Sequence, residues 1–504
     1  MLYVSKQNLG ENFETYPLKG ERMRYLPVLA GLWLLLAIAP GAIAADDVVI
    51  PPKLSLGDAV TLALGTNAKL KQATEEKRTS LSKLKIAGHN LSFELGSDAS
   101  LVRQSGTSDV GGLAFGRMSY NNLIGTNTTL NFYPLGLGNR TSSIDLSIRH
   151  PLGKGHGAFS QRGNALLSAK SDLAVQEKQF YLTQQSTALD VIQSYYQAVL
   201  AREQVKVREA AVASAETDAE GWRKREEAGM VAGIDVSRSE MQVTQTKDQL
   251  VEQQRVARNA LDKLLVAIGA GVGQSPELTD GVPDTAPDVP SLGDAVQKAL
   301  ESRPELAISD QQIEDQKRQV AYANDQLKPT MDIVAGFNGS RTDQGLIGAS
   351  ILNAGLFNAG IEYTMPIDRQ VSQENKDIAA RQLEVLNNMR VLQMEQITEQ
   401  VRSAYRSVEA AKASIDILMQ NQKTAEQNLH FAKRMMEEGE GSSRDLLEAQ
   451  QSLTDVQSNL LSAKTNLYLA CIDLKQAMGE DITGTTGQTT AKDTNETSTS
   501  DLGK

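Results

Sequence analysis

The sequence is poor in cysteine, in aromatic residues and in positive charge. Cys471 is the only cysteine among 504 residues, so no disulfide bond can form within one chain. Aromatic residues make up 5% of the chain, and its abundant Ala, Leu, Gln, Glu and Lys suit long helices better than a β-sandwich. The formal net charge of −11 argues against nucleic acid as the main partner, because binding to phosphates requires a basic surface.

The sequence contains no constellation of catalytic or metal-binding residues. The four histidines are scattered along the chain: His89, His150, His156 and His430. None of them has the spacing of a pair of zinc ligands. The glycine-rich segment 153–157 lacks the spacing of a Walker loop, and segment 269–273 follows a helix where a dinucleotide-binding loop follows a strand. We therefore expect no enzymatic activity, no cofactor and no metal site.

The N-terminal segment has the three parts of a secretory signal peptide. Basic residues precede the apolar run 25–39, and the small residues Ala42 and Ala44 occupy the cleavage positions. We therefore expect residues 1–44 to be a signal peptide, with an uncleaved anchor as the alternative. Met23 directly precedes the apolar run and is an alternative start. Beyond residue 44 no apolar run reaches about 18 residues, so we expect any membrane insertion to use β-strands.

Two copies of one unit make up most of the chain. The hexamer Ser55–Val60 recurs as Ser291–Val296, which lies 236 residues later, and the offset then falls to 210, as between Asp235 and Asp445. A shared register of this length indicates an internal duplication. The first copy therefore carries 26 extra residues, most of them within 110–139, which fit either a longer loop or extended strands.

The duplication sets the expected boundaries of the chain. Repeat 1 spans 45–269 and repeat 2 spans 291–482, and a linker with four prolines joins them at 270–290. Residues 483–504 are rich in Thr, Ser, Gly and Asp and have no apolar periodicity. We expect this last segment to be a disordered polar tail.

Each repeat is predicted to contain a capped helix, two strands and a long helical hairpin. A serine, Ser55 or Ser291, stands three residues before an aspartate, which is the spacing of a capping box. Apolar residues then alternate with polar ones at 144–148, at 331–337 and at 361–365. This period of two indicates strands with one apolar face.

The stretches 160–268 and 372–478 are predicted to form long helical hairpins. Each is almost free of proline and is broken once, by a short turn that contains glycine. In the last arm a leucine recurs every seven residues from Leu446 to Leu474, with Ala or Val offset by three. This heptad seam predicts antiparallel coiled-coil packing with a left-handed supercoil.

The order and spacing of these elements resemble the TolC-type outer-membrane efflux proteins. The resemblance covers roughly 54–479, and its motifs are the LxxAVxxAL start, strands that close in a proline, and the turns 225–236 and 439–446. It implies a mainly α fold with a β-barrel part. Long antiparallel coiled-coil hairpins would form a periplasmic α-barrel, and four strands per protomer would contribute to a trimeric, twelve-stranded transmembrane β-barrel.

The resemblance also implies a function. It implies a homotrimer in the cell outer membrane that contacts outer-membrane lipid and extends into the periplasm. As the channel or exit duct of a tripartite efflux or type I secretion system, it would passively conduct substrates delivered by an inner-membrane pump of RND or ABC type and a periplasmic adaptor (membrane fusion protein). The alternative is a periplasmic adaptor or a coiled-coil structural protein.

The resemblance places the hairpin turns at the periplasmic tips of the protein. It assigns Asp445 and Glu448 to an acidic ring at the pore constriction, with a solvated helix start as the alternative. It assigns Asp235 to a tip lock whose usual arginine is replaced by Gly441, and Arg444 lies close enough to substitute. The tip residues expected to contact the adaptor are Arg225, Gly229, Gly233, Gly439 and Gly441.

Overall fold

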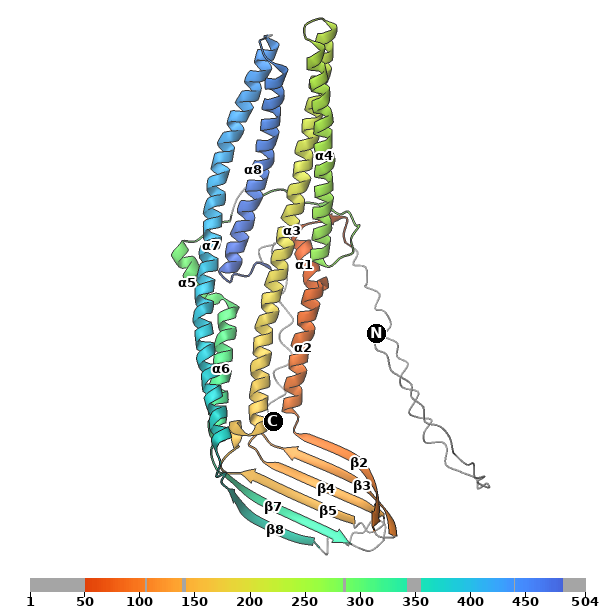
Figure 1. Cartoon of the computed structure of the whole chain (residues 1–504), viewed down its shortest axis with the longest axis vertical. Helices are drawn as coiled ribbons and strands as arrows, with labels where there is room; N and C mark the ends of the chain where they lie inside the picture. The colour runs from red at the N-terminus through yellow and green to blue at the C-terminus, as the bar shows by residue number, and fades with distance from the viewer. Residues whose placement is uncertain are drawn as a thin grey trace, which may run out of the picture. The chain divides into compact units, whose positions relative to one another are not determined.

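The computed structural model describes residues 50–483, apart from 105–106, 138–141, 284–286, 342–354 and 439. The expected signal peptide and the tail beyond Thr483 lie outside the described residues. The described part consists mainly of helices, to which a β-sheet is attached (Figure 1). This arrangement confirms the predicted mainly α fold with a β part. No helix of the described residues combines the length and the hydropathy needed to cross a membrane.

The two halves of the chain contain similar successions of elements. The first half comprises β1 (Lys53–Leu54), α1 (Leu56–Thr66), α2 (Ala68–Gly88), β2 (Leu91–Gln104), β3 (Thr107–Asn121), β4 (Asn127–Leu137), β5 (Ser142–Pro151), the 3-10 helix η1 (Gly157–Phe159), α3 (Gln161–Glu227) and α4 (Gly233–Ile268). The linker contributes β6 (Glu277–Leu278). The second half comprises α5 (Leu292–Ser302), α6 (Pro304–Asp325), β7 (Thr330–Arg341), β8 (Gly355–Thr364), α7 (Gln370–Glu437) and α8 (Ser443–Ala477).

Each half starts with two short helices joined by an elbow, where the sequence predicts one helix. The chain is extended at Asn67, whose side chain caps α2, and Pro304 starts α6, where its missing N–H costs nothing. Asn67 donates a hydrogen bond of 2.8 Å to the carbonyl of Ala267, and Arg303 donates one of 3.1 Å to the carbonyl of Ala477. Each elbow is therefore fixed to the end of its own hairpin.

The larger sheet has six strands in the order β2-β3-β4-β5-β7-β8, and all neighbouring strands are antiparallel. The structure thus differs from the expected two strands per repeat and four per protomer, because the first half contributes four strands. The extra residues of repeat 1 lengthen the sheet by a hairpin instead of forming a loop. Glycines such as Gly111, Gly112 and Gly116 interrupt the alternation in this hairpin, which is why the sequence pattern does not reveal it.

The sheet has one apolar and one polar face. Directly paired residues share a face, and one row of partners crosses all six strands: Phe93, Met118, Leu130, Leu146, Phe337 and Phe357. The neighbouring row is Ser92, Ser119, Thr129, Ser147, Gly336 and Asn358. Large apolar side chains stay exposed on the first face, with Phe93 67% and Phe357 83% exposed. Such a surface requires an apolar environment or a partner.

Two apolar cores lie where the short helices meet the long hairpins. The first core joins α1 to α3 and α4 through residues such as Val60, Val191 and Leu264, and the second joins α5 to α7 and α8 through residues such as Ala299, Val401 and Leu474. In the first core the Tyr195 hydroxyl donates a hydrogen bond to Asp280 of the linker at 2.7 Å and lies 3.0 Å from the Leu54 carbonyl oxygen. The core therefore also holds the linker.

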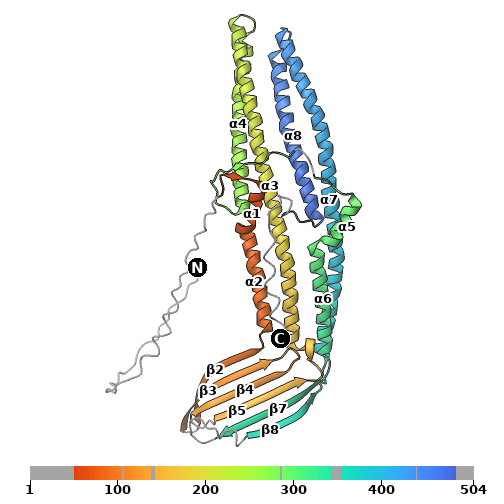
Figure 2. The ribbon, with the colours of Figure 1, turned by 180° about the vertical axis from the view of Figure 1, so that it is seen from behind.

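The helices are arranged side by side. On the sheet side of the short elbows, α2 packs on α3, α3 on α6 and α6 on α7 (Figures 1 and 2). On the other side, α4 packs on α3, α3 on α8 and α8 on α7. The long helices α3 and α7 therefore run through both parts and end in the two hairpin turns farthest from the sheet.

Candidate functional site at the hairpin tips

The two hairpin turns depend on glycines for different reasons. Gly229 has a φ of +72°, a left-handed conformation that glycine adopts without strain. A Cβ at Gly441 would lie 2.7 Å from the backbone nitrogen of Met436, so no larger residue fits there. A Cβ at Gly233 would meet only the flexible carboxylate of Glu226, at 2.8 Å. Gly439 lies outside the described residues.

A hydrogen bond joins the two tips. The buried Ser443 hydroxyl, at the start of α8, donates to Asp235 Oδ1, in the first turn of α4, at 2.8 Å. Arg238 on the same helix lies 3.5 Å from that oxygen. Within one chain, then, Asp235 is held by Ser443, and Arg444 is exposed beside it. A contact between Arg444 and Asp235 in the assembled protein stays a prediction.

The predicted acidic pair lies at the start of α8, on its exposed side. Asp445 and Glu448 are both exposed, whereas Leu446 between them is buried. Both carboxylates lie near the N-terminus of α8, where the helix dipole favours negative charge. Their side chains are therefore free to face solvent or another copy of the chain.

Aromatic and ionic contacts stabilise the tip of the first hairpin, which is formed by α3 and α4. The guanidinium of Arg225 lies 5.7 Å from the ring of Trp222, which is 4% exposed and packs inside the hairpin. Arg223 on α3 lies 2.6 Å from Glu240 on α4, and both side chains are well exposed. The Trp222 side chain is thus mainly a packing residue, and Arg225 is the more accessible of the two.

A polar seam connects the two hairpins below the tips. Gln204 donates to Ser462 at 3.0 Å, and Arg208 lies 3.3 Å from Asp455. Closer to the tips, Gln450 on α8 donates hydrogen bonds to Ser214 and Asp218 on α3. The polar seam thus consists of seven residues: Gln204, Arg208, Ser214, Asp218, Gln450, Asp455 and Ser462. Side-chain hydrogen bonds of this kind are readily replaced by hydrogen bonds to water, whereas the apolar contacts of a heptad seam are not.

The polar seam also contains a cavity. Its volume is about 160 Å³, and small residues such as Ala211, Ser214 and Ala215 line it together with Gln450. At the other end of the seam the contact becomes apolar, because Tyr196 and Tyr468 have ring centroids 4.7 Å apart. The two hairpins are therefore packed tightly near the elbows and loosely toward the tips.

Sequence reasoning missed Ser443 and the seam. Ser443 corresponds to Gly233 of the first repeat, so the duplication gives no reason to single it out. The seam does leave a signal, because Gln204, Arg208 and Asp218 recur at helical spacings on one side of α3. That polar stripe interrupts an otherwise apolar pattern and indicates a second, wetter interface.

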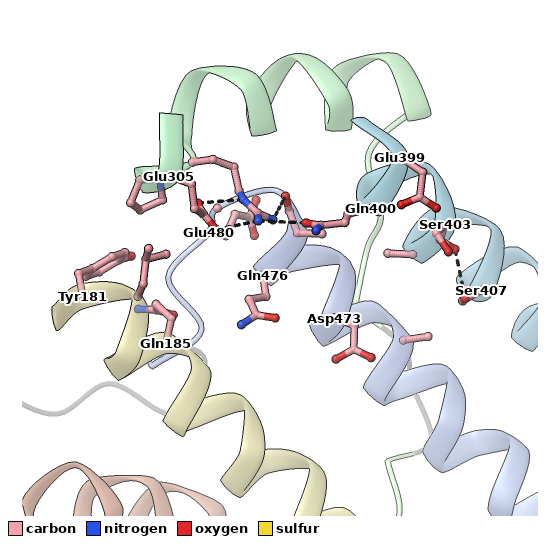
Figure 3. A pocket seen from close by; sticks show the side chains of 17 residues that line it. Tyr181, Gln185, Glu305, Glu399, Gln400, Ser403, Ser407, Asp473, Gln476 and Glu480 are labelled. Carbon is pink, nitrogen blue, oxygen red and sulfur yellow. Dashed lines mark hydrogen bonds and ion pairs between the residues drawn. The ribbon is translucent and has the colours of Figure 1, made fainter. Parts of the chain in front are cut away.

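A polar pocket lies where the two repeats meet. It has a volume of about 440 Å³ and lies between α3, the α5–α6 elbow, α7 and the end of α8 (Figure 3). Asp473 and Gln476 project from α8 toward this space, and Glu305 is held by Arg303 at 2.7 Å. Burial raises the pKa of Asp473, although Gln193 donates a hydrogen bond of 2.9 Å to its carboxylate and opposes the rise. Among the described residues, no group of His, Cys, Asp and Glu is arranged to hold a metal ion.

Solved structures with the same fold are outer-membrane channels. Crystal structures of CusC match with a TM-score of 0.67 and 16% identity, covering 84% of this chain and 92% of CusC. The CmeC outer membrane channel of Campylobacter jejuni matches with a TM-score of 0.65 and 17% identity, covering 84% of this chain and 85% of CmeC. At these identities the likeness shows the fold alone.

Sequence comparisons find relatives among outer-membrane efflux proteins. Residues 295–480 match the model of the "Outer membrane efflux protein" family. Outer membrane protein TolC of Escherichia coli (strain K12) is 24% identical over 335 residues, which span 62% of this chain and 66% of TolC. The cobalt-zinc-cadmium resistance protein CzcC of Cupriavidus metallidurans is 23% identical over 291 residues, which span 57% of this chain and 66% of CzcC. The match to this family over residues 295–480 agrees with the predicted resemblance, and the alignments span just under two thirds of these relatives.

Proposed function

We propose that the chain is the outer-membrane channel of a tripartite efflux or type I secretion system. It would passively conduct substrates handed over by an inner-membrane pump, of RND or ABC type, through a periplasmic adaptor. The observation that carries this proposal is the six-stranded sheet with an exposed apolar face, joined directly to two long helical hairpins. A sheet of this kind suits lipid on one side and water on the other, and the family match supports the same reading.

The sheet also supports self-assembly. Among the described residues, β2 and β8 each pair on one side only, so both edges of the sheet present unpaired backbone groups. Unpaired backbone groups are too costly in lipid, so other copies of the chain must complete the pairing. The homotrimer comes from the resemblance to the family, and the open edges give it a physical reason.

We assign the hairpin tips to closure of the channel and to contact with the adaptor. Asp445 and Glu448 would form an acidic ring in the trimer and favour cations. Asp235 and Arg444 would contribute to closure at the same level. The adaptor-facing residues would be Arg225, Gly229, Gly233, Gly439 and Gly441.

Membrane fractionation and planar-bilayer recordings test the proposed function together. The full chain should sediment with the outer membrane and migrate as a heat-modifiable trimer. The purified trimer should give discrete conductance steps in planar bilayers, with cation selectivity that falls when Asp445 and Glu448 are both changed to the corresponding amides. A soluble periplasmic monomer without conductance would favour a periplasmic adaptor or a coiled-coil structural protein instead.

A further inference from the structure

The polar pocket between α3, the α5–α6 elbow, α7 and α8 is large enough for a small molecule (Figure 3). Its volume of about 440 Å³ lies within the range of roughly 300–1,000 Å³ that ligand pockets occupy. Arg303 at the elbow holds the walls together, because it donates hydrogen bonds of 3.1 Å to the Ala477 carbonyl of α8 and to Gln400 of α7. The pocket is therefore built within one chain.

Two carboxylates of the pocket lack a cation. Glu305 forms an ion pair with an arginine of the elbow, and Glu480 forms one with a lysine of α5. Asp473 on α8 and Glu399 on α7 also line the pocket, and neither forms an ion pair within the part of the chain that the structure describes. The pocket therefore carries an excess of negative charge.

The carboxylate of Asp473 is partly buried without a compensating charge. Gln193 on α3 donates a hydrogen bond of 2.9 Å to it, and no other donor reaches it among the described residues. Burial raises the pKa of Asp473, because desolvation disfavours the charged form. A positively charged ligand in the pocket would supply the missing charge and so stabilise the ionised carboxylate.

The two unpaired carboxylates lie at different heights along the pocket. Because Arg303 contacts both Ala477 and Gln400, Glu399 lies at the level of the end of α8. Asp473 lies one helical turn nearer the tips, which corresponds to about 6 Å at roughly 1.5 Å per residue. A ligand that reaches both carboxylates therefore needs two positive groups separated by a short chain.

The remaining wall combines apolar side chains with neutral polar groups. Leu182 of α3, Ala404 of α7 and Ala470 of α8 supply apolar surface, against which methylene groups pack favourably. Ser403 and Gln476 add a hydroxyl and an amide, which can accept hydrogen bonds from an ammonium group. These walls suit an aliphatic chain that carries an amine at each end.

We propose that this pocket binds a linear aliphatic diamine, with one ammonium group at Asp473 and the other at Glu399. The methylene groups between them would lie against Leu182 and Ala404. An inorganic cation fits less well, since the described residues include no group arranged to hold a metal ion. The bound diamine would join α3 of the first repeat to α7 and α8 of the second, and so hold the two repeats together at the level of the elbows.

Calorimetry and thermal unfolding of the full chain purified in detergent test the site, with 1,4-diaminobutane as the probe. The diamine should bind once per chain and raise the unfolding temperature of the wild type. Asp473→Asn and Glu399→Gln should each weaken binding by about tenfold or more, because each removes one charge-assisted contact. Glu409→Gln is the matched control, since Glu409 is exposed on α7 and does not line the pocket, and its affinity should equal that of the wild type.

Matched ligands separate recognition of the diamine from general effects of charge. At equal ionic strength, 1-aminobutane should bind about tenfold or more weakly, and 1,4-butanediol should give no response, because they carry one ammonium group and none. Equal affinity for the diamine and the monoamine, or full affinity in both pocket variants, would overturn the proposal. So would the absence of diamine binding to the wild type. None of these measurements depends on conductance, so such results would leave the proposed channel function in place.

Discussion

Ser443 on α8 donates a hydrogen bond of 2.8 Å to Asp235 on α4, across 208 residues of sequence, and so ties the tips of the two hairpins together. The hydroxyl is buried, which shields this bond from water. Between this bond and the packed pair Tyr196–Tyr468, the contact between the hairpins is polar and contains a cavity. The hydrogen bond between Ser443 and Asp235 thus stabilises a part of the interface where apolar packing contributes little.

Removing the tip bond should favour separation of the tips. Ser443→Ala leaves the Asp235 carboxylate with Arg238 alone and costs about 1 kcal/mol of the contact between the hairpins. We expect several-fold more time in high-conductance states in planar bilayers. Ser458→Ala is the matched control, because among the described residues its hydroxyl donates only to the Thr454 carbonyl of its own helix. Equal conductance of the two variants would contradict a role for Ser443 in closure.

Filling the cavity in the polar seam should keep the two tips together. Ala215, which is 6% exposed, lines the cavity of about 160 Å³, and Leu at this position adds three carbons to an unfilled space. We expect Ala215→Leu to stabilise the folded chain by about 1 kcal/mol and to make openings rarer. Thermal unfolding followed by circular dichroism measures the first effect and bilayer recordings the second.

A matched substitution in a filled core gives the control for the cavity. Ala188 is fully buried in the first apolar core, so Ala188→Leu should destabilise the chain by about 1–3 kcal/mol through overpacking. A loss of stability in both variants would show that the seam has no usable space.

The main features of the fold follow from the sequence because they depend on periodicity. The alternating strands and the long helices reflect local geometry and occur in the structure, as does the capping box at Ser55, whereas Ser291 caps its helix only by accepting a bond from the Asp294 N–H. The extra hairpin β3–β4 could not be predicted with the same ease, since its glycines remove the side chains that would make the alternation visible. The elbow at Asn67 is equally hidden, because it depends on a tertiary contact with Ala267.

The candidate site was predictable only in part. The positions of Asp235 and Asp445 follow from the duplication, because each begins the returning arm of its hairpin. The identity of the partner of Asp235 does not follow, since Ser443 and Arg444 are adjacent and only the rotation of α8 decides which one turns inward. That rotation is fixed by the burial of Leu446, which is a property of the packed hairpin.

The buried carboxylate of Asp473 should make stability depend on pH. Burial raises its pKa, so the folded chain holds a proton more tightly than the unfolded chain. Between the two pKa values stability therefore falls as pH rises. Asp473→Asn should raise the unfolding temperature by about 1–2 °C at neutral pH, and the difference should vanish below about pH 4, the unfolded pKa of Asp. A difference that stays constant from pH 3 to pH 8 would rule out this origin.

The two faces of the sheet should respond differently to charge. Phe357 and Asn358 are adjacent on β8, so they lie on opposite faces. Phe357→Lys would place an ammonium on the apolar face at a cost of about 2–4 kcal/mol near the middle of a membrane, and Asn358→Lys should cost little. Immunoblots of outer-membrane fractions should show a several-fold loss for the first variant only. Equal yields would argue against lipid contact on this face.

Cys471 gives the chain a practical property. It is the single thiol of the sequence and is 1% exposed in the second apolar core, and burial raises its pKa, so the reactive thiolate is scarce. Maleimide reagents should therefore leave the native protein almost unlabelled. Cysteines introduced one at a time at the tips could be tagged with fluorophores or spin probes against a silent background, without first altering the natural sequence.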